Sequence, residues 1–210
     1  MRIYMVRHGE TIFNKKGCYY GRTDAVLSLQ GRQQAQSLRE YFRNIPLECV
    51  VTSPLCRAME TAQIIMAGYA GERNQKRNIK LYEEQRLFEQ NFGVFEGYTY
   101  QELLNKYPDE LANWNQDYYH YRIPGGESFM DVRKRTESFF DDLKKHAEQA
   151  SREKTILLVA HKGTLGHLLA VSLGLPPEGY WNFTIEQGCY SRMDLEDGYA
   201  IIRCLNKSAK

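Results

Sequence analysis

Residues 1–9 of the chain, MRIYMVRHG, form the stretch that decides the fold. Their apolar middle, Ile3 to Val6, predicts a short buried strand, and the polar pair Arg7-His8 follows at the carboxyl end of that strand. The apolar run is far too short for a signal peptide or a membrane span, and we expect neither. The opening residues are therefore interpreted as a buried strand that presents Arg7 and His8 at its end.

Strand and helix patterns alternate along the rest of the chain. Ser53-Pro54 predicts the start of a helix, with Ser53 as its N-cap and proline at the first helical position. The expected strands are 49–52, 155–160, 189–195 and 199–205, the last two joined by a turn at Asp197-Gly198; the expected helices follow Ser28, Ser53, Thr99, Gly126 and Gly163, and a polar loop is expected at 68–78.

Strands separated by helices predict an α/β fold with a mostly parallel sheet. The chain has 210 residues without an internal repeat, a low-complexity tract or a linker. A length of this size is enough for a sizeable core. We therefore expect a single domain that spans residues 1–210.

Composition excludes several classes of function. Hydrophobic residues make up 42% and charged residues 26% of the sequence, as in ordinary globular proteins, and the formal net charge is only +2. So small a charge gives no reason to expect a nucleic-acid or membrane partner. The five cysteines are scattered without a Cys-x-x-Cys pair, which indicates a reducing, cytoplasmic location and no metal knuckle.

Three expected strand ends carry basic or imidazole side chains. Arg7-His8 follows the first strand, Arg57 lies in the first turn after the second, and His161 follows the strand at 155–160. Open α/β sheets bind ligands beyond the carboxyl ends of their strands. Arginine forms paired hydrogen bonds with phosphate oxygens. The pattern therefore predicts a site for a dianion, most simply a phosphoryl group.

One of these histidines has the setting of a nucleophile. A neutral imidazole attacks phosphorus when one nitrogen is held as N–H and the other faces the substrate. His8 precedes Gly9, where a backbone carbonyl can fix the tautomer. The departing alkoxide then needs a proton, which a carboxylic acid on a nearby loop would supply.

Several short motifs together resemble the histidine phosphatase (phosphoglycerate mutase-like) superfamily over about residues 2–205. Their order and spacing carry the resemblance, since each string alone is weak. They are Arg7-His8-Gly9-Glu10-Thr11 with Asn14, Gly21-Arg22-Thr23-Asp24, Leu27-Ser28, Gly31-Arg32, Ser53-Pro54-Leu55-Cys56-Arg57-Ala58, Glu89-Gln90-Asn91-Phe92-Gly93, Glu96-Gly97, Pro124-Gly125-Gly126-Glu127-Ser128 and Val159-Ala160-His161.

The resemblance implies a three-layer fold with helices on both sides of the sheet, and roles for specific residues. His8 is the residue that is phosphorylated, Arg7, Arg57 and His161 complete the phosphate pocket, and Glu89 is the proton donor. Only the resemblance selects Glu89, because other glutamates lie near it. It also implies substrate contacts from Asn14, Tyr20 and Gly21, and no metal or cofactor. Lys162 departs from the family, which often has glycine there. Its side chain either points away or adds a cation near the phosphate, which makes it a further candidate for binding the substrate.

Within the superfamily, the carboxy-terminal motifs are most similar to alpha-ribazole phosphatase, which acts in assembling the nucleotide loop of cobalamin. These motifs are Trp181-Asn182-Phe183, Glu186-Gln187-Gly188-Cys189-Tyr190-Ser191 and Arg203-Cys204-Leu205-Asn206. The substrate this implies is a small phosphomonoester, either alpha-ribazole 5′-phosphate or adenosylcobalamin 5′-phosphate. The alternatives are a broad-specificity or sugar-phosphate phosphatase, a phosphoglycerate mutase, and a phospho-ligand binding module on an inactive enzyme fold.

Residues outside these motifs leave two questions open. The aromatic stretch 118–122 is interpreted either as a wall for the leaving group or as a cluster packed beneath a loop. His120, His146 and His167 are interpreted as structural or exposed. The sequence is compatible with a monomer or a homodimer.

Overall fold

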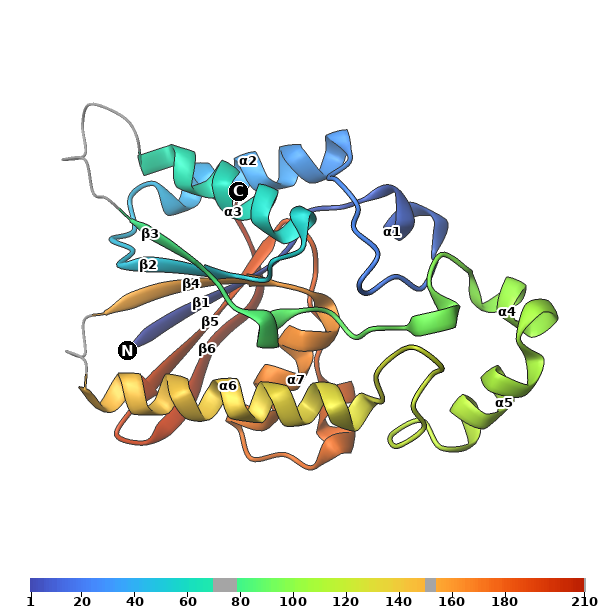
Figure 1. Ribbon diagram of the computed structural model, residues 1–210. Helices are drawn as coiled ribbons and strands as arrows, with labels where there is room; N and C mark the ends of the chain where they lie inside the picture. Colours follow the sequence, from blue (N-terminus) through green and yellow to red (C-terminus); the bar gives the residue numbers. More distant parts are fainter. Residues whose placement is uncertain (70–78, 150–153, 210) are drawn as a thin grey trace.

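A six-stranded sheet forms the middle of the molecule in the computed structural model, which describes residues 1–69, 79–149 and 154–209. Its strands lie in the order β3-β2-β4-β1-β5-β6 (Figure 1). The first four are parallel, and β5 and β6 run antiparallel at one side. Their bounds are β1 Arg2–Arg7, β2 Cys49–Thr52, β3 Lys80–Glu83, β4 Thr155–Ala160, β5 Cys189–Glu196 and β6 Tyr199–Ser208.

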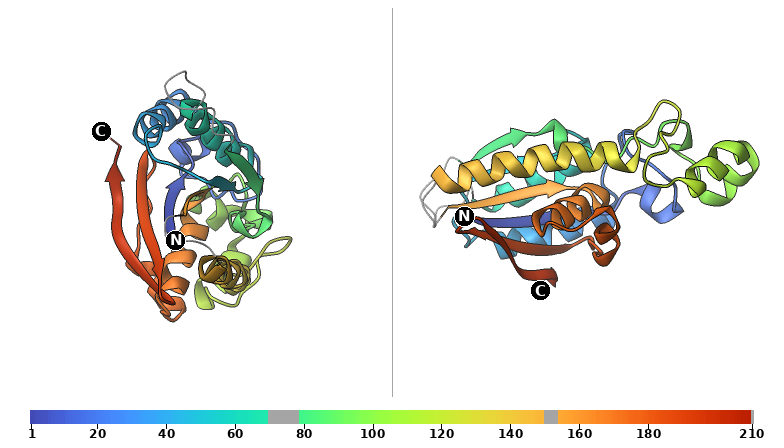
Figure 2. Two further views of the ribbon diagram at one scale, coloured as in Figure 1. Left: turned by 90° about the vertical axis from the view of Figure 1, so that its left-hand side faces the viewer. Right: turned by 90° about the horizontal axis from the view of Figure 1, so that it is seen from below.

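Helices cover both faces of this sheet, which confirms the expected three-layer α/β fold. Helices α2 and α3 lie on one face and α6 and α7 on the other, as Figures 1 and 2 show from different sides. All six residues of β4 are buried, because a central parallel strand is covered on both faces. The helices are α1 Ile12–Lys16, α2 Leu29–Phe42, α3 Cys56–Met66, α4 Tyr100–Lys106, α5 Pro108–Gln116, α6 Phe129–Gln149 and α7 Lys162–Ser172, with 3-10 turns at Ala67–Tyr69, Gln85–Leu87, Gly93–Phe95 and Pro177–Asn182.

Two hydrophobic cores follow from the alternation of side chains along the strands. Met5 of β1 packs with Phe139 and Leu168 on the α6–α7 face. Its neighbour Val6 packs with Leu38 on the α2–α3 face. The two cores fix the sheet between its helices, so the strand ends have a defined position.

A third cluster lies apart from the sheet. Phe95, Leu103, Leu111, Trp114 and Ile123 pack together beneath α4 and α5. These helices extend beyond the end of the sheet where the parallel strands finish (Figures 1 and 2). Helix α4 begins after Thr99, as expected, with a capping box between Thr99 and Glu102 whose two hydrogen bonds are both present.

The expected start of the helix after β2 is wrong. Helix α3 begins at Cys56, and Leu55 rather than Ser53 is its N-cap, without a side-chain hydrogen bond. The hydroxyl of Ser53 contacts another strand end instead, as described below. In the expected loop 68–78, Gly68 and Tyr69 belong to a 3-10 turn, and positions 70–78 lie outside the described residues.

Candidate active site

The carboxyl ends of three neighbouring strands meet at one edge of the sheet. His8 follows β1, Ser53 follows β2 and His161 follows β4, and β4 lies between the other two. The ring centroids of His8 and His161 are 5.0 Å apart. The sequence predicted this convergence, and the structure confirms it.

His8 is held as a neutral imidazole with one free nitrogen. Its side chain is almost fully buried, at 3% exposure, and its Nδ1 lies 2.7 Å from the carbonyl oxygen of Gly9. Burial, followed by the charges of Arg57 and Arg7, lowers the pKa of His8 well below its usual value, although the bond to Gly9 opposes this. A neutral ring that donates from Nδ1 keeps the lone pair of Nε2 available as a nucleophile.

Arg57 is a fully buried cation whose position is fixed by backbone carbonyls. Its Nη1 donates to the carbonyl of Thr23 at 3.0 Å and its Nη2 to the carbonyl of Gly21 at 2.7 Å. The guanidinium also lies over the ring of Tyr20, 4.6 Å from the centroid. A buried charge without an anionic partner is costly, so a negatively charged ligand would be stabilised here.

The loop that holds Arg57 is itself held by a carboxylate. Glu96 accepts hydrogen bonds from the backbone N–H groups of Gly21, Arg22 and Thr23, at 3.1, 2.7 and 2.6 Å. These bonds fix the loop whose carbonyls bind Arg57. This role of Glu96 was not predicted, and its place in the Glu96-Gly97 motif was the only signal in the sequence.

Arg7 and His161 contribute further buried donors. Arg7 Nη1 donates to the carbonyl of Ile185 at 2.9 Å, and His161 Nε2 lies 2.7 Å from Ser53 Oγ. Within the described part of the chain, three buried nitrogens next to His8 have no hydrogen-bond partner: Nε of Arg7, Nε of Arg57 and Nδ1 of His161. Buried N–H groups are almost always paired, so their gathering indicates a site for a ligand rich in acceptor oxygens.

Glu89 lies in the loop after the 3-10 turn Gln85–Leu87, and its side chain packs against the start of α7. Its Oε2 accepts from the backbone N–H of Gly163 at 3.0 Å, two residues after His161. A Cβ atom at position 163 would lie 2.4 Å from Oε1, so glycine is needed for this approach. The charge of Glu89 acts on both Arg7 and Arg57, raising their pKa values against the larger effect of burial.

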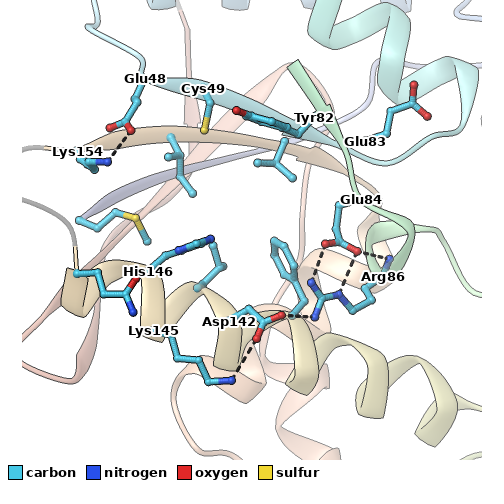
Figure 3. Close-up of a pocket in the computed structure, with 16 residues that line it drawn as sticks. Glu48, Cys49, Tyr82, Glu83, Glu84, Arg86, Asp142, Lys145, His146 and Lys154 are labelled. Carbon is cyan, nitrogen blue, oxygen red and sulfur yellow. Dashed lines mark hydrogen bonds and ion pairs between the residues drawn. The ribbon is translucent and has the colours of Figure 1, made fainter. Parts of the chain in front are cut away.

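The glutamates that lie near Glu89 in the sequence have other partners or line another part of the surface. Glu84 forms an ion pair with Arg86 at 2.8 Å, and Glu96 holds the loop of Arg57. Glu83 and Glu84 both line a groove of about 1030 Å³ between α6 and the β2–β3 side of the sheet (Figure 3). None of the candidate site residues lines this groove, whereas the charge of Glu89 acts on both arginines of the site.

Three of the four expected substrate contacts also lie at the site. The hydroxyl of Tyr20 donates to Asn14 Oδ1 at 2.8 Å and accepts from Thr11 at 2.9 Å. Gln187, which the sequence analysis did not single out, donates to the same oxygen of Asn14 at 2.8 Å.

Gly21 supplies the carbonyl that binds Arg57, whereas Lys162 has no such contact. The side chain of Lys162 is exposed at the first position of α7 and makes no hydrogen bond or ion pair with the described residues.

Aromatic side chains border the site on the side of α5 and α7. Tyr118 lies 5.3 Å from Trp181 between ring centroids, and Tyr180 lies 5.0 Å from Trp181. Burial and then neighbouring negative or polar groups, including Glu89, raise the pKa values of Tyr118 and Tyr180. The two phenols are therefore near Glu89, and Trp181 remains 57% exposed. Within the expected aromatic stretch, Tyr118 belongs to this border, whereas His120 is exposed and bonded to Asp117.

The described residues contain no group of three or more His, Cys, Asp or Glu side chains that could hold a metal ion. None of the described helices is long and apolar enough to cross a membrane. The arrangement has a free imidazole nitrogen, a ring of buried cationic and neutral N–H donors, and a carboxyl group. These groups suit the transfer of a phosphoryl group to nitrogen and the protonation of a departing oxygen.

Comparison with known proteins agrees with this geometry. The adenosylcobalamin/alpha-ribazole phosphatase of Salmonella typhimurium is 32% identical over 209 residues, covering 100% of this chain and 98% of the relative. The crystal structure of the alpha-ribazole phosphatase from Shigella flexneri matches with a TM-score of 0.87 and 31% identity, covering 99% of this chain and 96% of that one.

A relative named for another activity shows the breadth of the group. Phosphoserine phosphatase 1 of Hydrogenobacter thermophilus is 28% identical over 207 residues, covering 98% of this chain and 92% of the relative. The family model described as histidine phosphatase superfamily (branch 1) matches residues 3–208. The resemblance inferred from the short motifs is thereby confirmed, and the chain belongs to the histidine phosphatase superfamily.

Proposed function

We propose that this chain hydrolyses a phosphomonoester through a phosphohistidine at His8. The proposed substrate is alpha-ribazole 5′-phosphate or adenosylcobalamin 5′-phosphate, by similarity to relatives with those names. We also propose that the enzyme works in the cytoplasm, where its five unpaired cysteines would stay reduced.

One observation carries the chemical part of the proposal. Three buried nitrogens without a partner among the described residues, on Arg7, Arg57 and His161, surround an imidazole whose Nδ1 is already bonded to Gly9. In phosphoryl transfer, charge spreads over the equatorial oxygens of phosphorus. Donors that are fixed before the substrate arrives stabilise that charge without reorganisation.

The reaction then has two balanced steps. The lone pair of His8 Nε2 attacks phosphorus while the bond to the ester oxygen breaks, and protonated Glu89 gives its proton to that oxygen. Glu89, now a carboxylate, takes a proton from water as the water oxygen attacks phosphorus. The P–N bond breaks, inorganic phosphate leaves, and Glu89 is again protonated. The same carboxyl group serves as acid and then as base.

The aromatic border supports a flat leaving group. Tyr118 and Tyr180 lie near Glu89, where the alcohol would depart, and Trp181 contacts both of these rings. Aromatic faces favour stacking with a heteroaromatic base over contact with an open-chain polyol. A benzimidazole nucleoside has such a face, whereas phosphoserine and simple sugar phosphates do not.

Rapid-quench labelling tests the covalent step. With a ³²P-labelled phosphomonoester, the wild type should yield acid-labile, base-stable label on the protein, and His8→Ala should yield none and lose turnover. His146→Ala, which removes an exposed histidine on α6, is the matched control. Hydrolysis that survives in His8→Ala without label would contradict the mechanism.

A substrate panel tests the specificity. We expect the highest kcat/KM for alpha-ribazole 5′-phosphate or adenosylcobalamin 5′-phosphate, against phosphoserine, sugar phosphates and 3-phosphoglycerate. A preference for phosphoserine or sugar phosphates would replace the proposed substrate but keep the mechanism. Transfer of label to a phosphoglycerate rather than to water would indicate a mutase instead.

A further inference from the structure

Ser53 and His161 form a buried pair that the proposed mechanism does not yet use. Ser53 follows β2 and His161 follows the neighbouring strand β4, and both side chains have no exposed surface. Ser53 Oγ lies 2.7 Å from His161 Nε2. This distance defines a hydrogen bond, but it does not state which of the two atoms donates.

The other contacts of Ser53 settle the direction. Its Oγ accepts a hydrogen bond from the backbone N–H of Leu55 at 3.4 Å. The hydroxyl has one hydrogen of its own, and within the described residues no acceptor other than His161 lies within reach of it. If Nε2 were the donor, the hydroxyl hydrogen would be buried without a partner, which is costly. The arrangement that satisfies Ser53 has its O–H donating to Nε2.

His161 must then carry its hydrogen on the other nitrogen. Burial, followed by the charge of Arg57 and the proximity of His8, lowers the pKa of His161 well below its usual value, so the ring is neutral near pH 7. A neutral imidazole has one N–H, and Nε2 accepts from Ser53. The hydrogen therefore lies on Nδ1, which is buried and has no partner among the described residues.

We propose that Ser53 is a positioning residue that fixes the tautomer of His161, so that Nδ1–H donates a hydrogen bond to the bound phosphoryl group. This inference deepens the proposed function and rests on it for the identity of the ligand. In the opposite tautomer, the lone pair of Nδ1 would face phosphoryl oxygens and repel them. In other enzymes the wrong tautomer of a catalytic histidine costs several orders of magnitude in rate.

The same hydroxyl lies where the sequence predicts the N-cap of α3. A serine before a proline is a common helix start, but the Ser53 hydroxyl is bonded to a histidine on the next strand. The helix begins at Cys56, two residues later than expected, and Leu55 is its N-cap.

The direct test is the tautomer itself. In protein labelled with ¹⁵N-histidine, long-range ¹H–¹⁵N spectra distinguish a protonated ring nitrogen from a bare one, and His161→Asn identifies the signal. We expect His161 to be protonated at Nδ1 and bare at Nε2 in the wild type. In Ser53→Ala the tautomers should become mixed. A wild-type ring protonated at Nε2 would overturn the proposal.

Kinetics and phosphate binding form the second test. Ser53→Ala should lower kcat/KM for an aryl phosphate, and weaken the binding of inorganic phosphate, by about tenfold, the worth of one hydrogen bond. Ser53→Thr, which keeps the hydroxyl, should restore most of both values. Ser191→Ala is the matched control, since it removes another buried serine hydroxyl, one that accepts from Asn206.

These measurements separate the two proposals. The tautomer is read without turnover, so a wild type that hydrolyses phosphate esters but is protonated at Nε2 contradicts only the role of Ser53. Equal kcat/KM in Ser53→Ala and wild type contradicts that role as well. A protein with the expected tautomer but no phosphatase activity contradicts the proposed function instead.

Discussion

The site has two ends, the strand edge with His8 and the aromatic border with Trp181, and they are built from different interactions. At the strand edge, His8, Arg57 and His161 are 3% exposed or less, and directional bonds to Gly9, Gly21, Thr23 and Ser53 fix their polar atoms. At the aromatic border, the described contacts between Tyr118, Tyr180 and Trp181 are ring contacts, and Trp181 is more than half exposed.

The contrast indicates how the chemistry and the specificity are divided. A phosphate pocket made of paired hydrogen bonds loses function when any of its residues is replaced, because each replacement leaves a buried polar group without a partner. Ring packing is less directional, and substitutions there change which leaving group fits. Relatives named for alpha-ribazole and for phosphoserine agree with a fixed phosphoryl end and a variable leaving-group end.

The largest effect is expected at Glu89, which lies between the two ends. Glu89→Gln should slow the hydrolysis of alkyl phosphates by about 10²- to 10⁴-fold, because an alkoxide departs poorly without a proton. Aryl phosphates such as p-nitrophenyl phosphate should lose much less, since phenolates are better leaving groups. Glu83→Gln, in the separate groove, is the control. Equal losses for alkyl and aryl substrates would remove Glu89 from the role of acid.

The next effect tests the rigidity of the strand edge. Arg57→Lys keeps the charge but loses the planar fork that bonds to Gly21 and Thr23, so kcat/KM should fall by about 10²- to 10³-fold for alkyl and aryl substrates alike. Arg32→Lys, which changes an arginine paired with Glu60 near the surface, should leave kcat/KM unchanged. A loss of less than tenfold in Arg57→Lys would mean that charge alone suffices at this end.

The strand edge was largely predictable from the sequence, and for a physical reason. Parallel strands end at one edge, so the residues that follow β1, β2 and β4 had to meet there. Ser53 was assigned wrongly, because a local capping signal does not reveal a bond to a residue 108 positions away. Glu96 was not assigned a role, since it acts on a loop about 75 positions earlier.

The aromatic border was less predictable. Its rings come from the loop after α5 and from the 3-10 turn after α7, and no short motif joins them. The sequence left the stretch 118–122 with two interpretations, and the structure has features of both. Tyr118 contacts Trp181 at the border and also packs against the third cluster, while the side chain of His120 is exposed. Packing between distant segments follows from shape, which hydrophobic periodicity does not encode.

A smaller effect tests the aromatic border directly. Trp181→Ala should raise KM for alpha-ribazole 5′-phosphate by about tenfold, because stacking of one base on an aromatic side chain is worth about 1–3 kcal/mol. The kcat/KM for glycerol phosphate, which has no ring, should remain the same. Trp181→Phe keeps a stacking face and should recover most of the loss. Equal effects on both substrates would mean that Trp181 supports the fold rather than the leaving group.

The smallest effect concerns proton binding where the two ends adjoin. His167 on α7 packs against Phe129 and Tyr180, with ring centroids 4.3 and 4.8 Å away. Burial, followed by the charges of Arg135 and Arg133, lowers its pKa to about 3. The unfolded chain, with a histidine pKa of about 6.5, binds a proton that the folded chain excludes. Stability from this group is therefore present above pH 6.5 and is lost as the pH falls below it.

Urea denaturation of wild type and His167→Phe at pH 7.5 and pH 5.5 measures this contribution. The wild type should lose about 1.4 kcal/mol more free energy of unfolding than the variant over this interval. His8 and His161 have lowered pKa values in both proteins, so their contributions cancel in the comparison. An equal loss in the two proteins would mean that His167 takes up a proton in the folded state. The tightly packed region around the strand edge would then not include His167, next to the aromatic border.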